Sequence, residues 1–269
     1  MKFTKMQGTG NDYIYINCFE ETVERPEELA VKVSDRHFGI GSDGLILLCP
    51  SGQADCRMKM FNADGSESEM CGNGIRCVGK FVYDHHIVEK KEFDVETKAG
   101  IKHLKVTDEG GKAALITVDM GIPEVTGDVP EPIVVDGRSY EFIGISMGNP
   151  HAIYYMDEID DLDLEAIGPA FETHERFPER TNSEFIQVVD RSHLRMRVWE
   201  RGSGETWACG TGATASAVAS VLSGRTENTV EVELKGGTLQ ITWDRESGHV
   251  YMTGPAVEVF QGEFQPENL

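Results

Sequence analysis

The sequence predicts a mixed α/β protein made of two similar halves, each of which curls a sheet around one central helix. Three observations predict this fold: an internal repeat, many short runs of alternating polar and apolar residues, and two helical segments at matching positions of the repeat. A chain of 269 residues is long enough for two such halves, each with its own core.

The repeat becomes visible when the chain is aligned with itself at a shift of 138 residues, which places Cys71 on Cys209. A slip of one residue extends the match downstream. We therefore expect a first half of residues 1–115, with 256–269 packed back on it, a second half of 116–255, and an active site in the cleft between them. The matched segments are CGNG (71–74) with CGTG (209–212), RMKMF (57–61) with RMRVW (195–199), Gly10-Asn11 with Gly148-Asn149, and VETKAG (95–100) with VELKGG (232–237).

Short β-rich runs predict most of the strands, because side chains alternate between the two faces of a half-buried sheet. The expected strands are DYIYIN (12–17), RMKMF (57–61), ALITVDM (114–120), HAIYYM (151–156), RMRVW (195–199), TVEVELK (229–235) and TLQITW (238–243).

Three segments predict helices. Residues 26–36 begin with Pro26, which is favoured in the first turn of a helix. The segment 72–86 places Ile75, Val78 and Val82 on one face. The segment 210–224 is almost entirely small or apolar, as in a buried helix, and ends at a glycine.

Composition excludes several classes of function. The chain has 25 Lys and Arg against 46 Asp and Glu, a formal net charge of −21 that repels phosphate backbones, so we expect no nucleic-acid partner. The acidity is spread along the chain, as on a solvated surface. No apolar run is long enough to span a membrane, and the N-terminus has no apolar core of a secretory signal, so we expect a cytoplasmic protein without membrane contact.

Two of the six cysteines stand directly before the two central helices. A helix N-terminus presents backbone N–H groups and the positive end of the helix dipole, which together favour a thiolate and predict a pKa below the usual value of about 8.5. The neighbouring glycines, Gly72, Gly74, Gly210 and Gly212, let a ligand approach these N–H groups, which suit a carboxylate. The sequence contains no C-x-x-C pair, so the cysteine spacing does not indicate a zinc site.

Two opposed cysteines have a clear chemical use. Inversion of a carbon needs one base to remove a proton and an acid on the opposite face to return one, and a thiolate with a thiol performs both tasks. The helix N-termini would stabilise the charge that develops on the substrate carboxylate. The alternative, two structural cysteines beside ordinary glycine turns, is weakened because both motifs occupy one register of the repeat.

At these residues the sequence resembles the diaminopimelate epimerase family over essentially its whole length. The motifs that carry the resemblance are MQGTGNDY (6–13), FNADGSESEMCGNGIRC (61–77), GNPHAI (148–153), RTNSEF (180–185) and ERGSGETWACGTGA (200–213). It implies two pseudo-symmetric domains, each a mixed, mostly antiparallel sheet around a central helix. It also implies an isomerase that interconverts LL- and meso-diaminopimelate for lysine and peptidoglycan, without pyridoxal phosphate or metal, usually as a homodimer.

The resemblance also implies roles for individual residues. It implies that Cys71 and Cys209 are catalytic, and that His151 and Glu200 tune the pKa values of the cysteines. The residues implied to bind substrate are Asn11, Asn62, Asn149 and Asn182, the pair Glu200 and Arg201, and the helix-start residues Gly72, Asn73, Gly210 and Thr211. A substrate with two ammonium and two carboxylate groups suits this set of neutral amides, one acid and one arginine.

The chain departs from the family pattern at Gln7, where many members carry His, and at Gly44, where some carry a substrate-binding Gln. Only backbone atoms of Gly44 can serve that contact. We expect Arg76 and Cys77 to be structural, and Cys18, Cys49 and Cys56 to be buried or incidental.

Other interpretations remain at this point. A proline or hydroxyproline racemase shares the two-cysteine logic but has less use for Glu200, Arg201 and the asparagines. A phenazine-type isomerase of similar fold lacks the cysteine pair. A redox switch that closes a Cys71–Cys209 disulfide would belong to another functional class.

Overall fold

The computed structural model describes residues 1–268, which divide into two compact units. Unit 1 comprises Met1–Val118 and the C-terminal segment from Gly254, and unit 2 comprises Asp119–Thr253. Two strands run across these boundaries in the sequence: β8 (Lys112–Gly121) and β18 (Val250–Gly254).

Unit 1 contains a mixed sheet in which the strands pair in the order β19–β1–β2–β3–β4–β6–β7–β8. Two of these pairings, β2 with β3 and β4 with β6, are parallel, and the others are antiparallel. Its strands are β1 (Lys2–Gly8), β2 (Asn11–Asn17), β3 (Gly44–Cys49), β4 (Cys56–Asn62), β5 (Glu67–Ser68, paired with β4), β6 (Glu92–Thr97), β7 (Gly100–Glu109) and β19 (Val257–Glu263).

Unit 2 repeats this arrangement in the order β10–β11–β12–β13–β14–β16–β17–β18, with β12–β13 and β14–β16 parallel. Two short strands pair with β11 and β14. Its strands are β9 (Glu124–Val125), β10 (Glu131–Val135), β11 (Arg138–Ser146), β12 (Pro150–Tyr155), β13 (Asn182–Asp190), β14 (His193–Glu200), β15 (Gly204–Thr206), β16 (Thr229–Leu234) and β17 (Gly237–Trp243).

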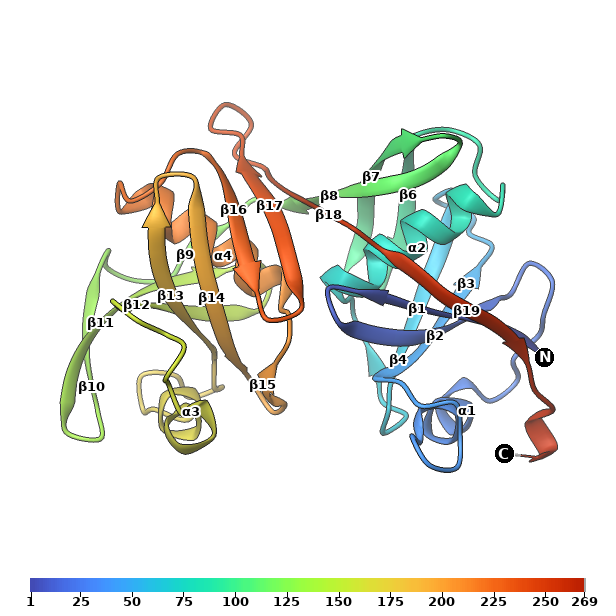
Figure 1. Ribbon diagram of the computed structural model, residues 1–269, viewed down its shortest axis with the longest axis horizontal. Helices are drawn as coiled ribbons and strands as arrows, with labels where there is room; N and C mark the ends of the chain where they lie inside the picture. Colours follow the sequence, from blue (N-terminus) through green and yellow to red (C-terminus); the bar gives the residue numbers. More distant parts are fainter. Residues whose placement is uncertain (269) are drawn as a thin grey trace. The chain divides into compact units, whose positions relative to one another are not determined.

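Helices supply the crossovers that parallel strands require. In unit 1, α1 (Pro26–Ser34) connects β2 with β3, and α2 (Gly72–Asp84) lies between β4 and β6 in the chain. In unit 2, α3 (Leu164–Glu172) and α4 (Gly210–Leu222) take the same places (Figure 1). Both pairs of helices keep the shift of 138 residues at each end. A short 3-10 helix, η1 (Pro266–Asn268), ends the described chain.

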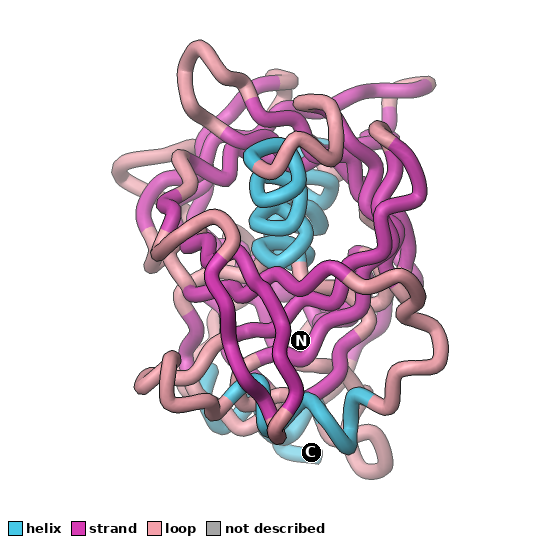
Figure 2. Tube along the Cα trace, turned by 90° about the vertical axis from the view of Figure 1, so that its left-hand side faces the viewer, coloured by secondary structure: helices cyan, strands magenta, loops and turns pink. Residues whose placement is uncertain are grey.

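The central helix of each unit is enclosed by its own sheet. Helix α2 contacts β1, β2, β7 and β19, and α4 contacts β11, β12, β13, β14, β16 and β17. Figure 2 shows a helix surrounded by strands when unit 2 faces the viewer. Ile75, Val78 and Val82 are each 0% exposed, which confirms the predicted buried face of α2. In α4 every residue from Gly212 to Ser220 is buried.

The predicted fold class is confirmed: each unit is a mixed, mostly antiparallel sheet around one helix. Each of the seven predicted strand runs falls on a strand, although 151–156 and 229–235 each extend one residue past its end. The three predicted helices form but end two residues earlier than the predicted segments. Helix α3 was not among the predicted elements. It contains Gly168 and Pro169, which disfavour a helix locally, but Asp163 caps its start by accepting a hydrogen bond from the Ala166 N–H at 3.2 Å.

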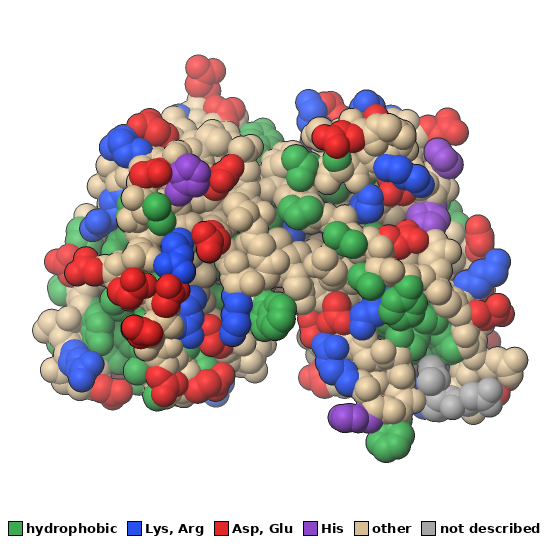
Figure 3. Space-filling model, viewed as in Figure 1, with side chains coloured by type: hydrophobic (Ala, Val, Ile, Leu, Met, Phe, Trp, Pro, Cys, Tyr) green, Lys and Arg blue, Asp and Glu red, His purple; other side chains and the backbone are tan. Residues whose placement is uncertain are grey.

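Charged side chains of both signs are interspersed over the surface, with acidic ones widely spread, as Figure 3 shows for one face. This distribution agrees with the predicted solvated surface. Among the described residues, every helix is too short or too polar to cross a bilayer.

Candidate active site

Each of the two aligned cysteines caps the central helix of its unit. The Cys71 sulfur accepts a hydrogen bond from the Gly74 N–H at 3.3 Å, and the Cys209 sulfur accepts one from the Gly212 N–H at 3.4 Å. Both cysteines have extended backbone, as N-cap residues usually do. One backbone N–H group at each helix start therefore points toward a sulfur atom.

In unit 1, an amide and a carboxyl extend the contacts of Cys71. Its thiol donates to Asn11 Oδ1 at 3.2 Å, and Asn11 Nδ2 donates to Asp43 Oδ2 at 2.7 Å. Burial, followed by the neighbouring Asp12 carboxylate, raises the pKa of Asp43. The sequence did not single out Asp43, although it follows Ser42 in the conspicuous GSDG segment.

Asn73 lies in the first turn of α2 and Arg76 in the second, and both are almost fully buried. Asn73 Oδ1 accepts hydrogen bonds from Thr9 Oγ1 and Arg76 Nη1, both at 3.1 Å. Arg76 also donates to the carbonyls of Gly72 and Pro255, both at 3.2 Å. Arg76 thus braces the helix start, as expected of a structural residue, and its charge also interacts with Cys71.

Two further predicted positions of unit 1 lie at one point of the sheet, where Asn62 on β4 pairs with Gly44 on β3. Asn62 Nδ2 donates to Ser66 Oγ at 3.0 Å. A Cβ at Gly44 would lie 2.2 Å from the Phe61 carbonyl oxygen and 2.8 Å from Tyr13, so no other side chain fits there without movement.

In unit 2, Asn149 and His151 lie beside the start of α4. Asn149 Nδ2 donates to Thr211 Oγ1 at 3.3 Å, and Thr211 Oγ1 lies 3.5 Å from the Cys209 sulfur. His151 Nε2 lies 3.1 Å from Asn149 Oδ1, and His151 Nδ1 lies 2.7 Å from Glu184 Oε1. Four side chains, from α4, β12, β13 and the turn before β12, are therefore linked to the thiol.

The end of β14 adds the predicted pair Glu200 and Arg201. Thr206 Oγ1 donates to Glu200 Oε1, and Glu200 also interacts with the Cys209 thiol. Asn182 positions the adjoining turn because its Oδ1 accepts from the Arg201 backbone N–H at 3.0 Å, while its Nδ2 donates to the Pro150 carbonyl at 2.8 Å. The Arg201 guanidinium reaches the Glu179 carbonyl at 3.3 Å.

The electrostatics of Cys209 differ from the prediction. Burial first, and then the negative charges of Glu200 and Glu184, raise the pKa of this thiol, although the helix start and Thr211 act in the opposite direction. The expectation of a lowered pKa was therefore wrong for Cys209, because two carboxylates and burial outweigh the helix N-terminus. Burial also raises the pKa of Glu200.

Glu184 is the residue of this cluster that the sequence reasoning missed. It is 0% exposed, and it stands in the RTNSEF motif two residues after Asn182 on the same face of β13. The sequence could have indicated Glu184, because it is a charged residue in a strand whose first five residues are all buried.

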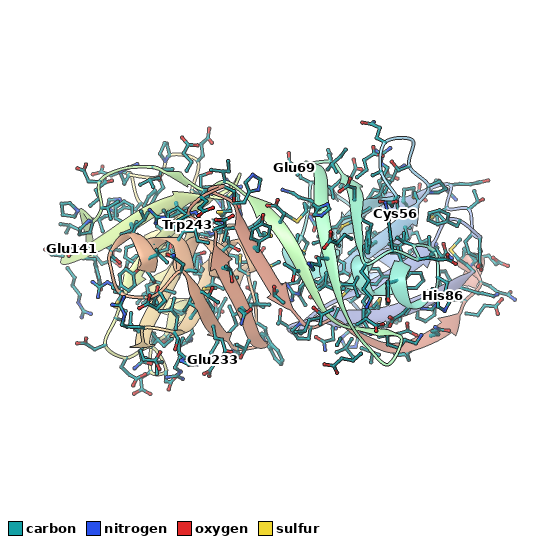
Figure 4. All side chains as sticks on the ribbon, turned by 90° about the horizontal axis from the view of Figure 1, so that it is seen from above. Cys56, Glu69, His86, Glu141, Glu233 and Trp243 are labelled. Carbon is teal, nitrogen blue, oxygen red and sulfur yellow. The ribbon has the colours of Figure 1, made fainter. Side chains whose placement is uncertain are left out.

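The other four cysteines lie elsewhere. Cys56 and Cys77 are buried, and burial raises their pKa values to about 12 and about 11; Figure 4 labels Cys56 on β4 of unit 1. Cys18 and Cys49 are half-buried and adjacent, and the Cys18 N–H donates to the Leu48 carbonyl at 2.8 Å. Across residues 1–268, no group of three or more His, Cys, Asp or Glu side chains is arranged to hold a metal ion.

Comparison with known proteins identifies the family. The family model described as "Diaminopimelate epimerase" matches residues 3–126 and 143–259. A protein of that name from Desulfovibrio desulfuricans is 59% identical, with 98% of each chain covered. Another from Acetivibrio thermocellus is 57% identical, with 100% of each chain covered.

Solved structures show how widely the fold is shared. A PhzF-family phenazine biosynthesis protein from Bacillus anthracis aligns with a TM-score of 0.75 at 19% identity, covering 98% of this chain and 99% of its own. A probable proline racemase from Agrobacterium radiobacter aligns with a TM-score of 0.73 at 14% identity, covering 98% and 92%. These similarities concern the fold alone, and the curated relatives do not favour the racemase or redox-switch interpretations. The chain belongs to the diaminopimelate epimerase family.

Proposed function

We propose that this protein interconverts LL- and meso-2,6-diaminopimelate by removing and returning one α-proton, as an isomerase that uses neither pyridoxal phosphate nor metal. The observation that carries the proposal is the placement of Cys71 and Cys209 at the N-caps of two helices that correspond in a duplicated fold. High identity to curated proteins of that name supports the choice of substrate. The product would serve lysine and peptidoglycan synthesis.

In the proposed cycle one cysteine enters as thiolate and the other as thiol. The thiolate takes the α-proton and becomes a thiol, and the electron pair of the broken C–H bond delocalises into the substrate carboxylate. The second cysteine then donates its proton to the opposite face of the carbon and becomes the thiolate. The reverse reaction exchanges the two roles, so no proton or electron is gained overall.

The helix starts would stabilise the charge that develops on the carboxylate. Backbone N–H groups at Gly72 and Asn73, and at Gly210 and Thr211, are the donors that such a carboxylate requires. The fixed positions of these residues support this role, since Asn73 and Thr211 are both held by side-chain hydrogen bonds. Preorganised donors do not have to reorient as the charge forms.

The remaining residues would bind the ammonium and carboxylate groups at the two ends of the substrate. Glu200 suits an ammonium group and Arg201 a carboxylate. Asn11, Asn62, Asn149 and Asn182 supply amides that both donate and accept. We assign His151 and Glu200 the further task of tuning the cysteines, which the interaction of Glu200 with the Cys209 thiol supports.

We further propose that the enzyme works in the cytoplasm as a homodimer. Partly exposed apolar side chains on β19, namely Val257, Val259 and Phe260, support a second copy as a partner. Sedimentation of the purified protein at several concentrations would test this, since a mass of one chain throughout would refute the dimer.

The experiment that tests the activity is incubation of the reduced protein with LL-diaminopimelate in deuterated water, without any cofactor. We expect meso product with deuterium at one α-carbon. Exchange of the α-proton of proline, with none in diaminopimelate, would overturn the assignment.

A further inference from the structure

A buried histidine and a buried carboxylate lie behind the start of α4. His151 on β12 and Glu184 on β13 both have side chains that are 0% exposed, and Nδ1 of the ring lies 2.7 Å from Oε1 of the carboxylate. Because a carboxylate only accepts hydrogen bonds, the ring donates through Nδ1. The second carboxylate oxygen, Glu184 Oε2, is buried without a hydrogen-bond partner among the described residues. A buried carboxylate oxygen without a partner costs free energy of folding, so its presence calls for an explanation.

The carboxylate lies near the catalytic cysteine proposed above, with Gly212 between them. The position that a Cβ would occupy at Gly212 lies 2.6 Å from Glu184 Oε1 and 3.3 Å from the Cys209 sulfur. Only a residue without a side chain leaves room between the two groups. The titratable groups packed around Cys209 are thus Glu200 on β14 and Glu184 on β13, with His151 on β12 held by Glu184.

The repeat shows what unit 1 has at the same places. A shift of 138 residues places Ile46 at the position of Glu184 and Tyr13 at that of His151. A Cβ at Gly74 would meet Ile46 Cδ1 at 2.8 Å, so an isoleucine methyl packs where unit 2 has a carboxylate oxygen. The buried cation near Cys71 is Arg76, whose counterpart in unit 2 is the neutral Thr214. The other titratable groups around Cys71 are the buried Tyr15 and Cys77, and Asp43, which is linked to the thiol through Asn11.

We propose that Glu184 is a positioning residue that makes the two cysteines unequal, by orienting His151 and by keeping the proton on Cys209 in the resting enzyme. Cys209 then enters the cycle as the acid, and Cys71, beside a buried cation, enters as the base. This inference rests on the two-cysteine mechanism proposed above.

The arrangement solves a problem of the duplicated fold. Two identical half-sites would leave the resting proton shared equally, and half of the enzyme molecules would wait in the wrong form for a given substrate epimer. A negative charge near one thiol and a positive charge near the other select one form, since like charge disfavours a thiolate and opposite charge favours it. The asymmetry is built by side chains that need not touch the substrate.

The test measures the alkylation of each cysteine by iodoacetamide across pH, read by peptide mass spectrometry on the full-length protein without substrate. In the unaltered protein we expect Cys71 to react with a lower pH midpoint than Cys209. In Glu184→Gln, which preserves an acceptor for His151, the Cys209 midpoint should fall by about one pH unit, while that of Cys71 stays in place. The midpoint reports ionisation, whereas accessibility changes only the limiting rate.

Two variants serve as controls. Glu184→Asp retains the charge and should keep the Cys209 midpoint near its original value. Glu172→Gln removes another buried carboxylate of unit 2, which accepts from Trp199 Nε1 at 2.7 Å, and should leave the midpoint unchanged. A folded Glu184→Gln protein with an unshifted Cys209 midpoint would overturn the inference. If Glu184→Gln does not fold, a lower midpoint for Cys209 than for Cys71 in the unaltered protein would do so. Neither readout requires turnover, so failure of the epimerase proposal is detected separately, by the deuterium experiment.

Discussion

Gly212 and Glu184 are in such close contact that a methyl group on the glycine would lie 2.6 Å from the carboxylate oxygen. Gly212→Ala must therefore displace Glu184 or the start of α4. We expect a loss of about 1–3 kcal/mol of unfolding free energy, as in overpacked cores, together with lower turnover. Thermal unfolding and epimerase assays would measure both.

The matched control lies at the same place in unit 1. An alanine at Gly74 would meet the flexible end of Ile46 at 2.8 Å and that of Met58 at 3.3 Å, and both can rotate away. Because alanine also favours the helix by up to about 1 kcal/mol, we expect Gly74→Ala to be tolerated better. Equal losses in the two variants would contradict the special role of the buried carboxylate.

Thr206→Val tests the environment of Glu200. The hydroxyl donates to this carboxylate, and its hydrogen bond lowers the Glu200 pKa against the larger effect of burial. Without the donor, the pKa rises further and the carboxylate is lost at a higher pH. We expect the acidic limb of kcat/KM to move upward in pH and KM to rise more than kcat falls. An unchanged pH profile would show that Glu200 does not bind the substrate ammonium as a carboxylate.

The repeat carried most of the fold prediction. Cys71 and Cys209 occupy the same position in the two copies. The alternating runs predict which side chains of each strand face the core. Helix α3 escaped prediction because Gly168 and Pro169 oppose it locally, while tertiary contacts favour it: a Cβ at Gly168 would lie 2.2 Å from the Trp199 ring. Packing of this kind leaves no signature in local propensity.

The sequence predicted the positions of the two cysteines, because these follow from the local chemistry of a helix start. It did not predict the pKa of Cys209, because that depends on burial and on charges brought close by folding. Gly72 and Gly210 indicated the starts of two helices, and Cys71 and Cys209 cap these helices. Burial first, and then the carboxylates of Glu200 and Glu184 from neighbouring strands, raise the pKa of Cys209. Only the folded chain brings these charges to the thiol.

Replacement of either cap cysteine tests the proposed chemistry directly. A serine hydroxyl ionises far less readily than a thiol, so Cys71→Ser and Cys209→Ser should each lower turnover by at least about 100-fold. Cys49→Ser is the control, because Cys49 lies at the far end of β3 and has no proposed role. Full activity in either cap variant would refute the two-base mechanism.

Cys49 itself should react at neutral pH, although it is outside the site. A hydrogen bond from Cys18, followed by the charges of Lys59 and Arg57, outweighs burial and lowers the pKa of Cys49 to about 7. The thiolate is therefore present above pH 7, and alkylation should rise through that value, whereas Cys56, whose pKa is raised to about 12, should stay unmodified in the folded protein. Lys59→Met removes one favourable charge and should move the Cys49 midpoint upward. A midpoint near 9 in the unaltered protein would mean that the Cys18 thiol does not donate to Cys49, and peptide mapping after iodoacetamide treatment distinguishes the two results.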